Sequence, residues 1–464
     1  MDDMIRERLA SAGMTPAAAG AKAVLFARAT DALRAMRPAT SDAFAFWVPG
    51  RVEFLGKHTD YAGGRSLLCT VERGICLVSA PRDDATIRIT DVSLGDSATF
   101  AMDPELHPPI GHWSNYPMTV ARRLARNFPG ARRGADIALA SDLPLASGIS
   151  SSSAFVVAVF LALAAANALD GDSLFRAEVP DDIALASYLG CVENGQSFGA
   201  LAGDRGVGVF GGSEDQTAIL CCRPGMLSQY SFCPVRGEGA VPFPPGHVLA
   251  IANSGVIAEK AGAARDAYNR ASLSTRALVE RWNEGTGRTD AVLADAIGSA
   301  PDAADRLRAM AASWTDGAFP AEYLVNRLDQ FVDESTRIIP AVRAALEHGD
   351  LARVGALVAG SQANAESLLG NQVPETVALV QMAREAGAVA ASAFGAGFGG
   401  SVWALVQARD ADAWAQEWLS RYGRAFPAAA VRASVFVTPA GPPAVRLGRV
   451  APLGGSAPGA HLGA

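Results

Sequence analysis

Lysine is scarce in this chain, and neither cysteine nor histidine occurs in a pattern typical of a metal site. Of the 40 basic residues, 37 are arginines and three are lysines, at positions 22, 57 and 260. The formal net charge is −7, so no basic excess favours non-specific binding to nucleic acid. None of the six cysteines lies in a C-x-x-C pair and the six histidines are scattered, which argues against the usual zinc sites.

Signals for export and for membrane insertion are also missing. The N-terminal Met-Asp-Asp-Met has no basic segment followed by an apolar one, as a signal peptide would have. The longest apolar run, residues 154–169, has 16 residues including Asn167, which is short for a membrane span of about 20 residues. Six thiols in so long a chain do not suggest a disulfide framework. We therefore expect a cytoplasmic protein without a membrane partner, and a buried helix at 154–169.

What is present is the composition of a folded protein. Half of the 464 residues are apolar and 19% are charged, which predicts two or three domains with a large core. The segment 242–246, Pro-Phe-Pro-Pro-Gly, is the best candidate for a domain boundary. Because strands and helices mix without strict alternation, we predict an α+β fold with domains 1–245 and 246–440 and a flexible tail, 441–464. Helices are expected at 15–36, 113–128, 154–169, 181–202, through most of 260–386 and at 409–424, and strands at 44–48, 75–79, 86–90, 135–140, 217–222, 228–235, 248–252, 388–394, 402–406 and 431–437.

A serine-rich loop gives the sharpest functional signal. Residues 143–154 read Leu-Pro-Leu-Ala-Ser-Gly-Ile-Ser-Ser-Ser-Ser-Ala and lead directly into the apolar helix. Small residues allow close approach of a ligand, and a helix start presents unpaired N–H groups that bind phosphate. Serine hydroxyls can also coordinate Mg²⁺. The alternative is a helix cap with more serine than it needs.

Two segments match the pattern G-x-G-x-x-G, at 206–211 and 395–400. A dinucleotide fold needs a strand before the motif and a helix after it. The first segment follows a predicted helix and the second precedes a predicted strand, so neither fits. The second could still wrap a phosphate with backbone N–H groups, or it could be only a tight hairpin.

Two further segments carry polar side chains suited to a site. Residues 51–61, Arg-Val-Glu-Phe-Leu-Gly-Lys-His-Thr-Asp-Tyr, offer donors and acceptors for a polyhydroxylated ligand, or form a solvated loop. Asp215 follows Gly211 and Gly212 and could act as a general base, or be an acidic turn residue. P-loop, zincin and α/β-hydrolase motifs are all absent from the sequence.

Taken in order, these segments resemble the GHMP kinase superfamily, and the galactokinase family in particular. Residues 49–64 are similar to P-G-R-V-N-L-I-G-E-H-T-D-Y-N-G-G, and residues 143–154 to L-P-x-G-x-G-L-S-S-S-A. The likeness runs from about residue 44 to 407. Other matching segments are 113–116 (W-x-N-Y), 211–216 (C-G-I-M-D-Q), 253–256 (N-S-x-V), 268–270 (Y-x-x-R) and 394–400 (T-G-G-G-F-G-G).

The resemblance implies a ribosomal-S5-like N-terminal domain and a ferredoxin-like C-terminal domain, with transfer of the ATP γ-phosphoryl group to the anomeric hydroxyl of galactose or a related sugar. It makes Asp215 and Arg51 the catalytic residues, and Ser152 and Glu193 the Mg²⁺ ligands. We expect a monomer that binds a small sugar and ATP. The implied sugar contacts are Arg51, Lys57, His58, Asp60, Gly212, Asp215 and Tyr268. The implied ATP contacts are Ser147, Gly148, Ser150, Ser151, Ser152, Gly395 and Gly397.

Three departures from the family pattern matter. Lys57 replaces the glutamate that holds the hydroxyl on carbon 6 in galactokinases. An ammonium cannot accept that hydrogen bond, so one hypothesis is a uronic acid or another sugar altered at carbon 6, and the alternative is that Lys57 turns to a structural partner. Glu193 lies about ten residues further from Asp215 than is usual. Glu214 replaces a methionine. If it faced the site together with Asp215, their charges would couple and raise one pKa, but on the predicted strand it would face away from Asp215.

Two rival functions remain open from the sequence. One is another GHMP kinase, acting on a different sugar or on an isoprenoid-pathway alcohol, although the polar segment 51–61 favours a sugar. The other is a non-catalytic regulator that binds sugar and ATP, although Arg51 and Asp215 are both present.

Overall fold

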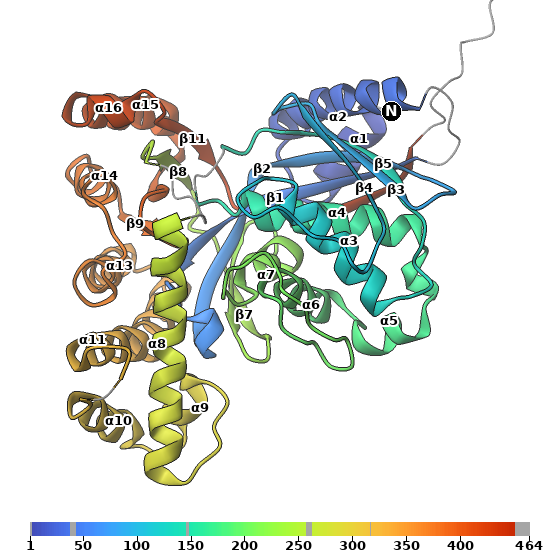
Figure 1. The fold of residues 1–464 in the computed structure, drawn as a ribbon. Helices are drawn as coiled ribbons and strands as arrows, with labels where there is room; N and C mark the ends of the chain where they lie inside the picture. Colours follow the sequence, from blue (N-terminus) through green and yellow to red (C-terminus); the bar gives the residue numbers. More distant parts are fainter. Residues whose placement is uncertain (1, 38–42, 145–147, 257–261, 316, 451–464) are drawn as a thin grey trace, which may run out of the picture.

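The computed structural model describes residues 2–37, 43–144, 148–256, 262–315 and 317–450, and shows an α+β fold built on two sheets. An eight-stranded sheet forms the centre of the N-terminal half, and a four-stranded antiparallel sheet lies in the C-terminal half (Figure 1). The strands are β1 (Ala43–Leu55), β2 (Arg65–Pro81), β3 (Thr86–Asp91), β4 (Asp96–Ala101), β5 (Ala135–Ser141), β6 (Met226–Ser231), β7 (Arg236–Pro242), β8 (His247–Asn253), β9 (Ala390–Phe394), β10 (Ser401–Gln407), β11 (Ser434–Thr438) and β12 (Val445–Val450).

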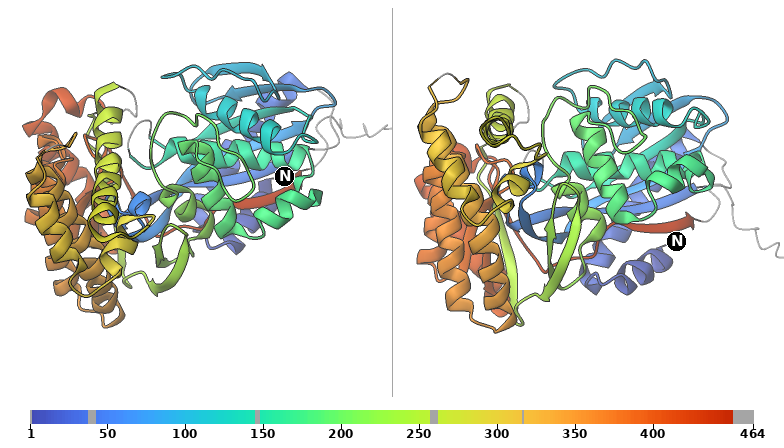
Figure 2. Two further views of the ribbon diagram at one scale, coloured as in Figure 1. Left: turned by 60° about the horizontal axis from the view of Figure 1, so that its bottom comes forward. Right: turned by 90° about the horizontal axis from the view of Figure 1, so that it is seen from below.

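Helices cover both faces of the larger sheet and surround the smaller one (Figures 1 and 2). The helices are α1 (Asp2–Ser11), α2 (Pro16–Met36), α3 (Asn115–Asn127), α4 (Ser151–Ala166), α5 (Ser173–Glu178), α6 (Asp182–Asn194), α7 (Glu214–Cys221), α8 (Gly262–Thr286), α9 (Leu293–Gly298), α10 (Ala303–Ala312), α11 (Ala321–Val332), α12 (Ile339–Glu347), α13 (Leu351–Asn364), α14 (Pro374–Glu385), α15 (Ala411–Ala425) and α16 (Pro427–Ala430). Short 3-10 or π turns are η1 (Asp60–Ala62), η2 (Leu169–Gly171), η3 (Asp333–Ile338), η4 (Ala365–Leu369) and η5 (Ala408–Asp410).

The larger sheet has the order β12-β1-β2-β5-β3-β4, with β6 paired to β2 and β7 paired to β6. Helices α1 and α2 pack on one face, and α4 packs on the other, with α3 and α6 outside it. Because α4 is apolar all round, it is buried between the sheet and its neighbouring helices, which confirms the predicted buried helix. No helix among the described residues is long and apolar enough to cross a membrane.

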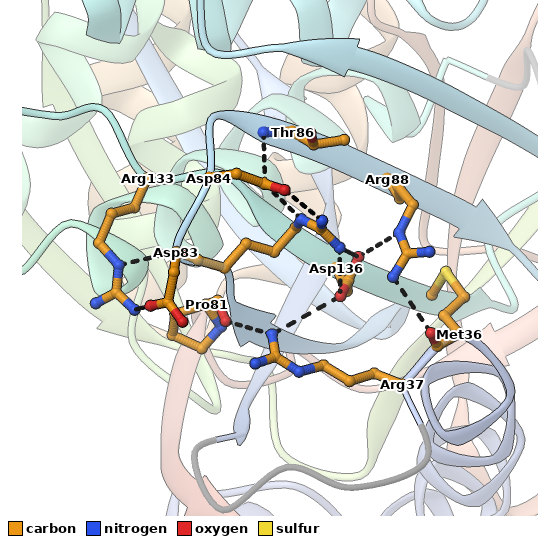
Figure 3. Close-up of polar contacts among 10 residues, drawn as sticks. Met36, Arg37, Pro81, Asp83, Asp84, Thr86, Arg88, Arg133 and Asp136 are labelled. Carbon is orange, nitrogen blue, oxygen red and sulfur yellow. Dashed lines mark hydrogen bonds and ion pairs between the residues drawn. The ribbon is translucent and has the colours of Figure 1, made fainter.

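A charged cluster fixes the C-terminal end of α2 to this sheet (Figure 3). Asp136 on β5 is fully buried, and it accepts hydrogen bonds from Arg88 Nε (2.6 Å) and Arg82 Nη1 (3.2 Å). Arg37, which caps α2, lies 3.8 Å from the same carboxylate. A buried carboxylate is tolerated only when it is paired, so the three arginines stabilise the position of α2 against β3 and β5.

The smaller sheet has the order β11-β8-β10-β9 and packs one face against α14 and α15. Its other face continues the core of the N-terminal half. The rings of Phe54 on β1 and Trp403 on β10 stack with their centroids 4.1 Å apart. The two halves therefore share one core. The second half of β1, the starts of α4 and α7 and the end of β9 meet at the junction.

Several predicted elements differ in the structure. Residues 217–221 belong to helix α7 rather than to a strand, and Cys222 follows the helix. The strand prediction rested on a short apolar run without a clear period. The helix predicted to reach residue 202 ends at Asn194, where Gly195 adopts a left-handed conformation. The run 228–235 is not one strand, because the chain turns there between β6 and β7.

The predicted tail is wrong in its first part. Residues Val445–Val450 form β12, which pairs antiparallel with β1 at the edge of the larger sheet. Leu447 is fully buried against α1 and α2. The glycines near the end of the sequence suggested a loose tail, but pairing with a strand about 400 positions away leaves no local signal. Residues 451–464 lie outside the described residues.

Candidate active site

A cavity of about 450 Å³ lies at the junction of the two halves. It is lined by β1, the start of α4, the ends of α6 and α7 that face each other, α8 and the loop between β9 and β10. Ser147 lies outside the described residues. The predicted site residues that line the cavity are Arg51, Asp60, Gly148, Ser150, Ser151, Ser152, Glu193, Gly212, Asp215, Tyr268, Gly395 and Gly397.

Arg51 and Asp215 form an ion pair in this cavity. Arg51 Nε and Nη2 lie 2.8 and 2.7 Å from Asp215 Oδ1, and Arg51 Nη1 donates to the carbonyl of Gly148 at 2.6 Å. Burial alone would lower the pKa of the Arg51 guanidinium, but the carboxylates of Asp215, Glu214 and Glu53 raise it above its ordinary value. The pair therefore holds one oxygen of Asp215 in place and keeps a fixed positive charge beside it.

A second carboxylate approaches Asp215 through a serine. Ser153 Oγ lies 2.8 Å from Glu193 Oε2 and 3.0 Å from Asp215 Oδ2, so its single hydrogen can be donated to only one of them at a time. Gln216 Nε2 donates to the same oxygen of Glu193 at 2.7 Å. Two carboxylates and serine hydroxyls at the mouth of a phosphate loop are the donor set that Mg²⁺ takes together with substrate phosphates.

The serine beside Glu193 is Ser153, whereas the sequence resemblance pointed to Ser152. Ser152 also lines the cavity, one position earlier on the first turn of α4. Neighbouring residues of a helix point in directions about 100° apart, so only one of the two can face α6. The extra residues between Glu193 and Asp215 form the loop 195–213 and leave the two side chains on facing helix ends.

The start of α4 is open toward the cavity. Ser150 is the residue that precedes the helix, with a left-handed φ of 56°, and its side chain makes no capping hydrogen bond. The serines there therefore do not serve as an ordinary cap, and the first N–H groups of α4 stay available to an anion.

The loop between β9 and β10 faces the start of α4. It joins two antiparallel strands, as the sequence predicted. Gly395 and Gly397 both have positive φ, 79° and 77°, and a Cβ at Gly397 would lie 2.3 Å from the carbonyl of Asn371. Glycine is required here by both conformation and space.

Asp60, Gly212 and Tyr268 lie on the side of the cavity next to Asp215. Asp60 Oδ2 accepts from the N–H of Glu214 at 3.2 Å, and a Cβ on Gly212 would lie 2.4 Å from that same oxygen. Burial raises the pKa of Asp60 above its usual value. The ring centroids of Tyr268 and His58 lie 5.0 Å apart.

His58 is not among the described residues that line the cavity, but it contacts Ala396, which does line it. Its Nε2 faces the carbonyl of Ala396 at 2.9 Å, so this nitrogen carries the proton and Nδ1 accepts from the hydroxyl of Tyr61. Burial lowers the pKa of His58 to about 4. Arg327 on α11 donates to the backbone carbonyl of His58, which fixes this loop to the C-terminal half.

Lys57 also lies outside the cavity lining. It is 1% exposed, and its Nζ donates to Ser392 Oγ at 2.8 Å and to Ser361 Oγ at 3.2 Å. The ammonium therefore turns to structural partners in the C-terminal half. This removes the basis for the uronic acid hypothesis, which required Lys57 to reach a substrate carboxylate.

Glu214 does not face away from the site as the strand prediction required. On helix α7 it lines the cavity next to Asp215 and accepts a hydrogen bond from the Ser66 hydroxyl. Burial, followed by the charges of Glu53 and Asp60, raises the pKa of Glu214 well above its usual value. Glu53 also lines the cavity, although it is not among the predicted site residues, and it stands where the family form has asparagine.

The far end of the cavity is apolar. Trp113 and Tyr116, at the start of α3, line it together with Leu94, Ile110 and Phe155. The rings of Trp113 and Phe155 have centroids 5.9 Å apart, and Trp113 Nε1 donates to Asp96 at 2.8 Å. Such a surface suits a flat aromatic base.

Comparisons with known proteins agree with this architecture. Residues 38–81 match the galactokinase galactose-binding signature, 115–191 the GHMP kinases N terminal domain, and 342–425 the GHMP kinases C terminal domain. A galactokinase from Actinobacillus pleuropneumoniae is 26% identical over 370 residues, covering 79% of this chain and 86% of the relative. A galactokinase from Chloroflexus aggregans is 28% identical over 379 residues, covering 81% and 86%.

The fold also matches a solved structure. The crystal structure of Lactococcus lactis galactokinase complexed with galactose has a TM-score of 0.72 and 22% identity, and covers 90% of this chain and 98% of that one. Each of the three matched ranges contributes residues to the lining of the cavity. The chain therefore contains the N-terminal and C-terminal domains of GHMP kinases together with the galactose-binding signature of the galactokinase family.

Proposed function

We propose that this protein is a galactokinase, which transfers the γ-phosphoryl group of ATP to the anomeric hydroxyl of galactose. The observation that carries the proposal is the ion pair between Arg51, in the galactose-binding signature, and Asp215, at the start of α7. The names of the relatives support galactose as the sugar.

Asp215 is the group that orients the sugar hydroxyl and accepts its proton. Its Oδ1 is held by Arg51, which leaves Oδ2 on the side of Ser153. Arg51 adds a fixed positive charge where the transferred group gains negative charge. Phosphoryl transfer depends mainly on such positioning and charge neutralisation.

ATP occupies the other part of the cavity. The open N–H groups at the start of α4 and the glycine loop 395–400 bind its phosphates, and the apolar end at Trp113 and Tyr116 receives the base. Mg²⁺ neutralises the phosphate charge when bound, and Glu193 with the serine hydroxyls of α4 would hold it.

Phosphorylation by the purified chain tests the proposal. With Mg²⁺ and ATP fixed, a panel of galactose, glucose, mannose, galacturonate and mevalonate is assayed for ADP release, and the product is assigned by phosphorus NMR. We expect ADP release with galactose and a phosphate on carbon 1. Binding of sugar and ATP without ADP release would indicate a regulator, and turnover of mevalonate alone would indicate a different GHMP kinase.

A further inference from the structure

Glu53 and Lys57 are two coordinated departures from the family motif. Where that motif has asparagine and glutamate, this chain has glutamate and lysine, so the carboxylate stands four positions earlier. Glu53 lies on β1 two residues after Arg51, and alternate residues of a strand share a face. Both side chains line the cavity, whereas Lys57 does not.

The Glu53 carboxyl has one oxygen in use and one without a partner. Glu53 is 2% exposed, and its Oε2 accepts from the N–H of Gly395 at 3.2 Å, which ties it to the glycine loop. Within the described part of the chain, Oε1 has no hydrogen-bond partner and is buried. A buried oxygen in this state is unfavourable unless a ligand supplies a donor.

Lys57 is placed to act on Glu53 through charge. Its ammonium is fixed by Ser392 and Ser361, and Ser361 in turn donates to Glu334 Oε1 at 3.0 Å. The ammonium therefore lies near two buried carboxyls, Glu53 on the cavity side and Glu334 on the side of α11.

The charges around Glu53 keep it able to ionise. Burial raises its pKa to about 7, and repulsion from Glu334 adds to this, while Lys57 and Arg51 oppose it. Glu214 also interacts with Glu53 through charge. Without Lys57, a buried carboxyl in this position would stay protonated to higher pH.

We propose that Glu53 is a specificity-determining residue whose free Oε1 accepts a hydrogen bond from a hydroxyl of the bound sugar, and that Lys57 is a positioning residue that serves as its buried counter-ion. The inference rests on the proposed function and names how that site recognises the sugar. A sugar bound beside Arg51 and Asp215 brings hydroxyl donors to the surface that Glu53 lines. The interaction is lost for a sugar that lacks that one hydroxyl.

Monodeoxygalactoses lacking the hydroxyl at carbon 2, 3, 4 or 6 identify the contact. With the wild type, we expect the analogue that lacks the partner of Glu53 to lose about 10- to 100-fold in kcat/KM relative to galactose. In Glu53→Met, which removes the acceptor at similar volume, galactose should fall by that factor while this analogue changes little. Glu72→Gln, a buried glutamate on β2 outside the cavity, is the matched control and should keep the wild-type pattern.

Lys57→Met separates positioning from contact. We expect the preference among the deoxy sugars to be retained, while the acid limb of kcat/KM against pH moves to higher pH. Glu53→Asn combined with Lys57→Glu restores the family pair and should recover galactose turnover relative to Lys57→Glu alone. If Glu53→Met is too unstable to assay, Glu53→Leu, which also removes the acceptor, gives the same comparison with sugar binding measured by calorimetry.

The outcomes distinguish the two proposals. If the wild type does not phosphorylate galactose, the proposed function fails. If it does, but Glu53→Met and Glu53→Leu slow all four deoxy sugars and galactose by one common factor, Glu53 is structural and the inference is overturned. A changed deoxy-sugar preference in Lys57→Met would overturn the assignment of Lys57 as a counter-ion, because it would indicate direct contact with the sugar.

Discussion

Arg51 Nη2 lies 2.7 Å from Asp215 Oδ1, joining two residues that are 164 positions apart in the chain. The pair links strand β1 to helix α7 and closes one side of the cavity. The site therefore needs both segments, because each of them supplies only one of the two charges of the pair.

Replacing Asp215 should stop phosphoryl transfer without unfolding the protein. Asp215→Asn keeps an oxygen for Arg51 but removes the negative charge that accepts the proton. We expect kcat to fall by about 10²- to 10⁴-fold, with a thermal midpoint close to that of the wild type. The coupled ADP assay and a melting curve measure both. Asp305→Asn, on the exposed face of α10, is the control, and unchanged kcat in Asp215→Asn would remove that residue from the mechanism.

Gly212→Ala should displace Asp60. A Cβ at this position would lie 2.4 Å from Asp60 Oδ2 and 2.9 Å from the backbone nitrogen of Tyr61. We expect kcat/KM for the sugar to fall by about 100-fold, because small misplacements of positioning groups are costly. KM for ATP should change little. Gly171→Ala, which meets no atom within 4 Å, should behave as wild type, and equal sugar kinetics in the two variants would contradict the prediction.

Burial of neutral His58 should make the protein less stable in acid. Burial lowers the pKa of His58 from 6.5 to about 4, and the charges of Arg327 and Lys57 act in the same direction. Because the unfolded chain binds this proton more readily than the folded one, the stabilisation is present above pH 6.5 and is lost as the pH falls toward 4. The loss is at most about 3 kcal/mol in the free energy of unfolding.

Urea unfolding of the wild type and His58→Gln across this pH range measures the effect as a difference between two profiles. The difference is needed because Glu53, whose pKa is raised to about 7, contributes in the opposite sense between pH 4.5 and 7. The two profiles should converge toward pH 4. His107→Gln, at an exposed position, should run parallel to the wild type, and a parallel His58→Gln profile would show that folding does not lower the pKa of His58.

Removing β12 should weaken the N-terminal half. Ending the chain after residue 444 removes the strand that covers the edge of β1 and leaves a gap where Leu447 packs. We expect the free energy of unfolding to fall by about 3 kcal/mol or more, with aggregation through the exposed strand edge. Ending the chain after residue 450 keeps the strand and is the matched control. Equal stability of the two truncated chains would mean that β12 adds nothing to the fold.

The sequence alone was enough for the fold class, for the order of most elements and for the segments that form the cavity. The apolar run at α4 and the glycine loop at 395–400 carry strong local patterns, so each could be placed from its own residues. Helix α7 was missed because eight residues with a short apolar run fit a strand as well as a helix. Because this segment is a helix and not a strand, Glu214 lines the cavity next to Asp215 instead of facing away from it.

What only the tertiary structure decided is which side chains meet. Lysine is rare in this chain, and the position of Lys57 in the motif predicts a substrate contact. Its partners, Ser361 and Ser392, lie 304 and 335 positions away, and no local pattern indicates them. The same holds for Ser153 on Glu193 and for Glu53 beside Gly395. Local propensity and periodicity are properties of neighbours in the chain, whereas the partner of a buried charge is fixed only when distant elements pack around it.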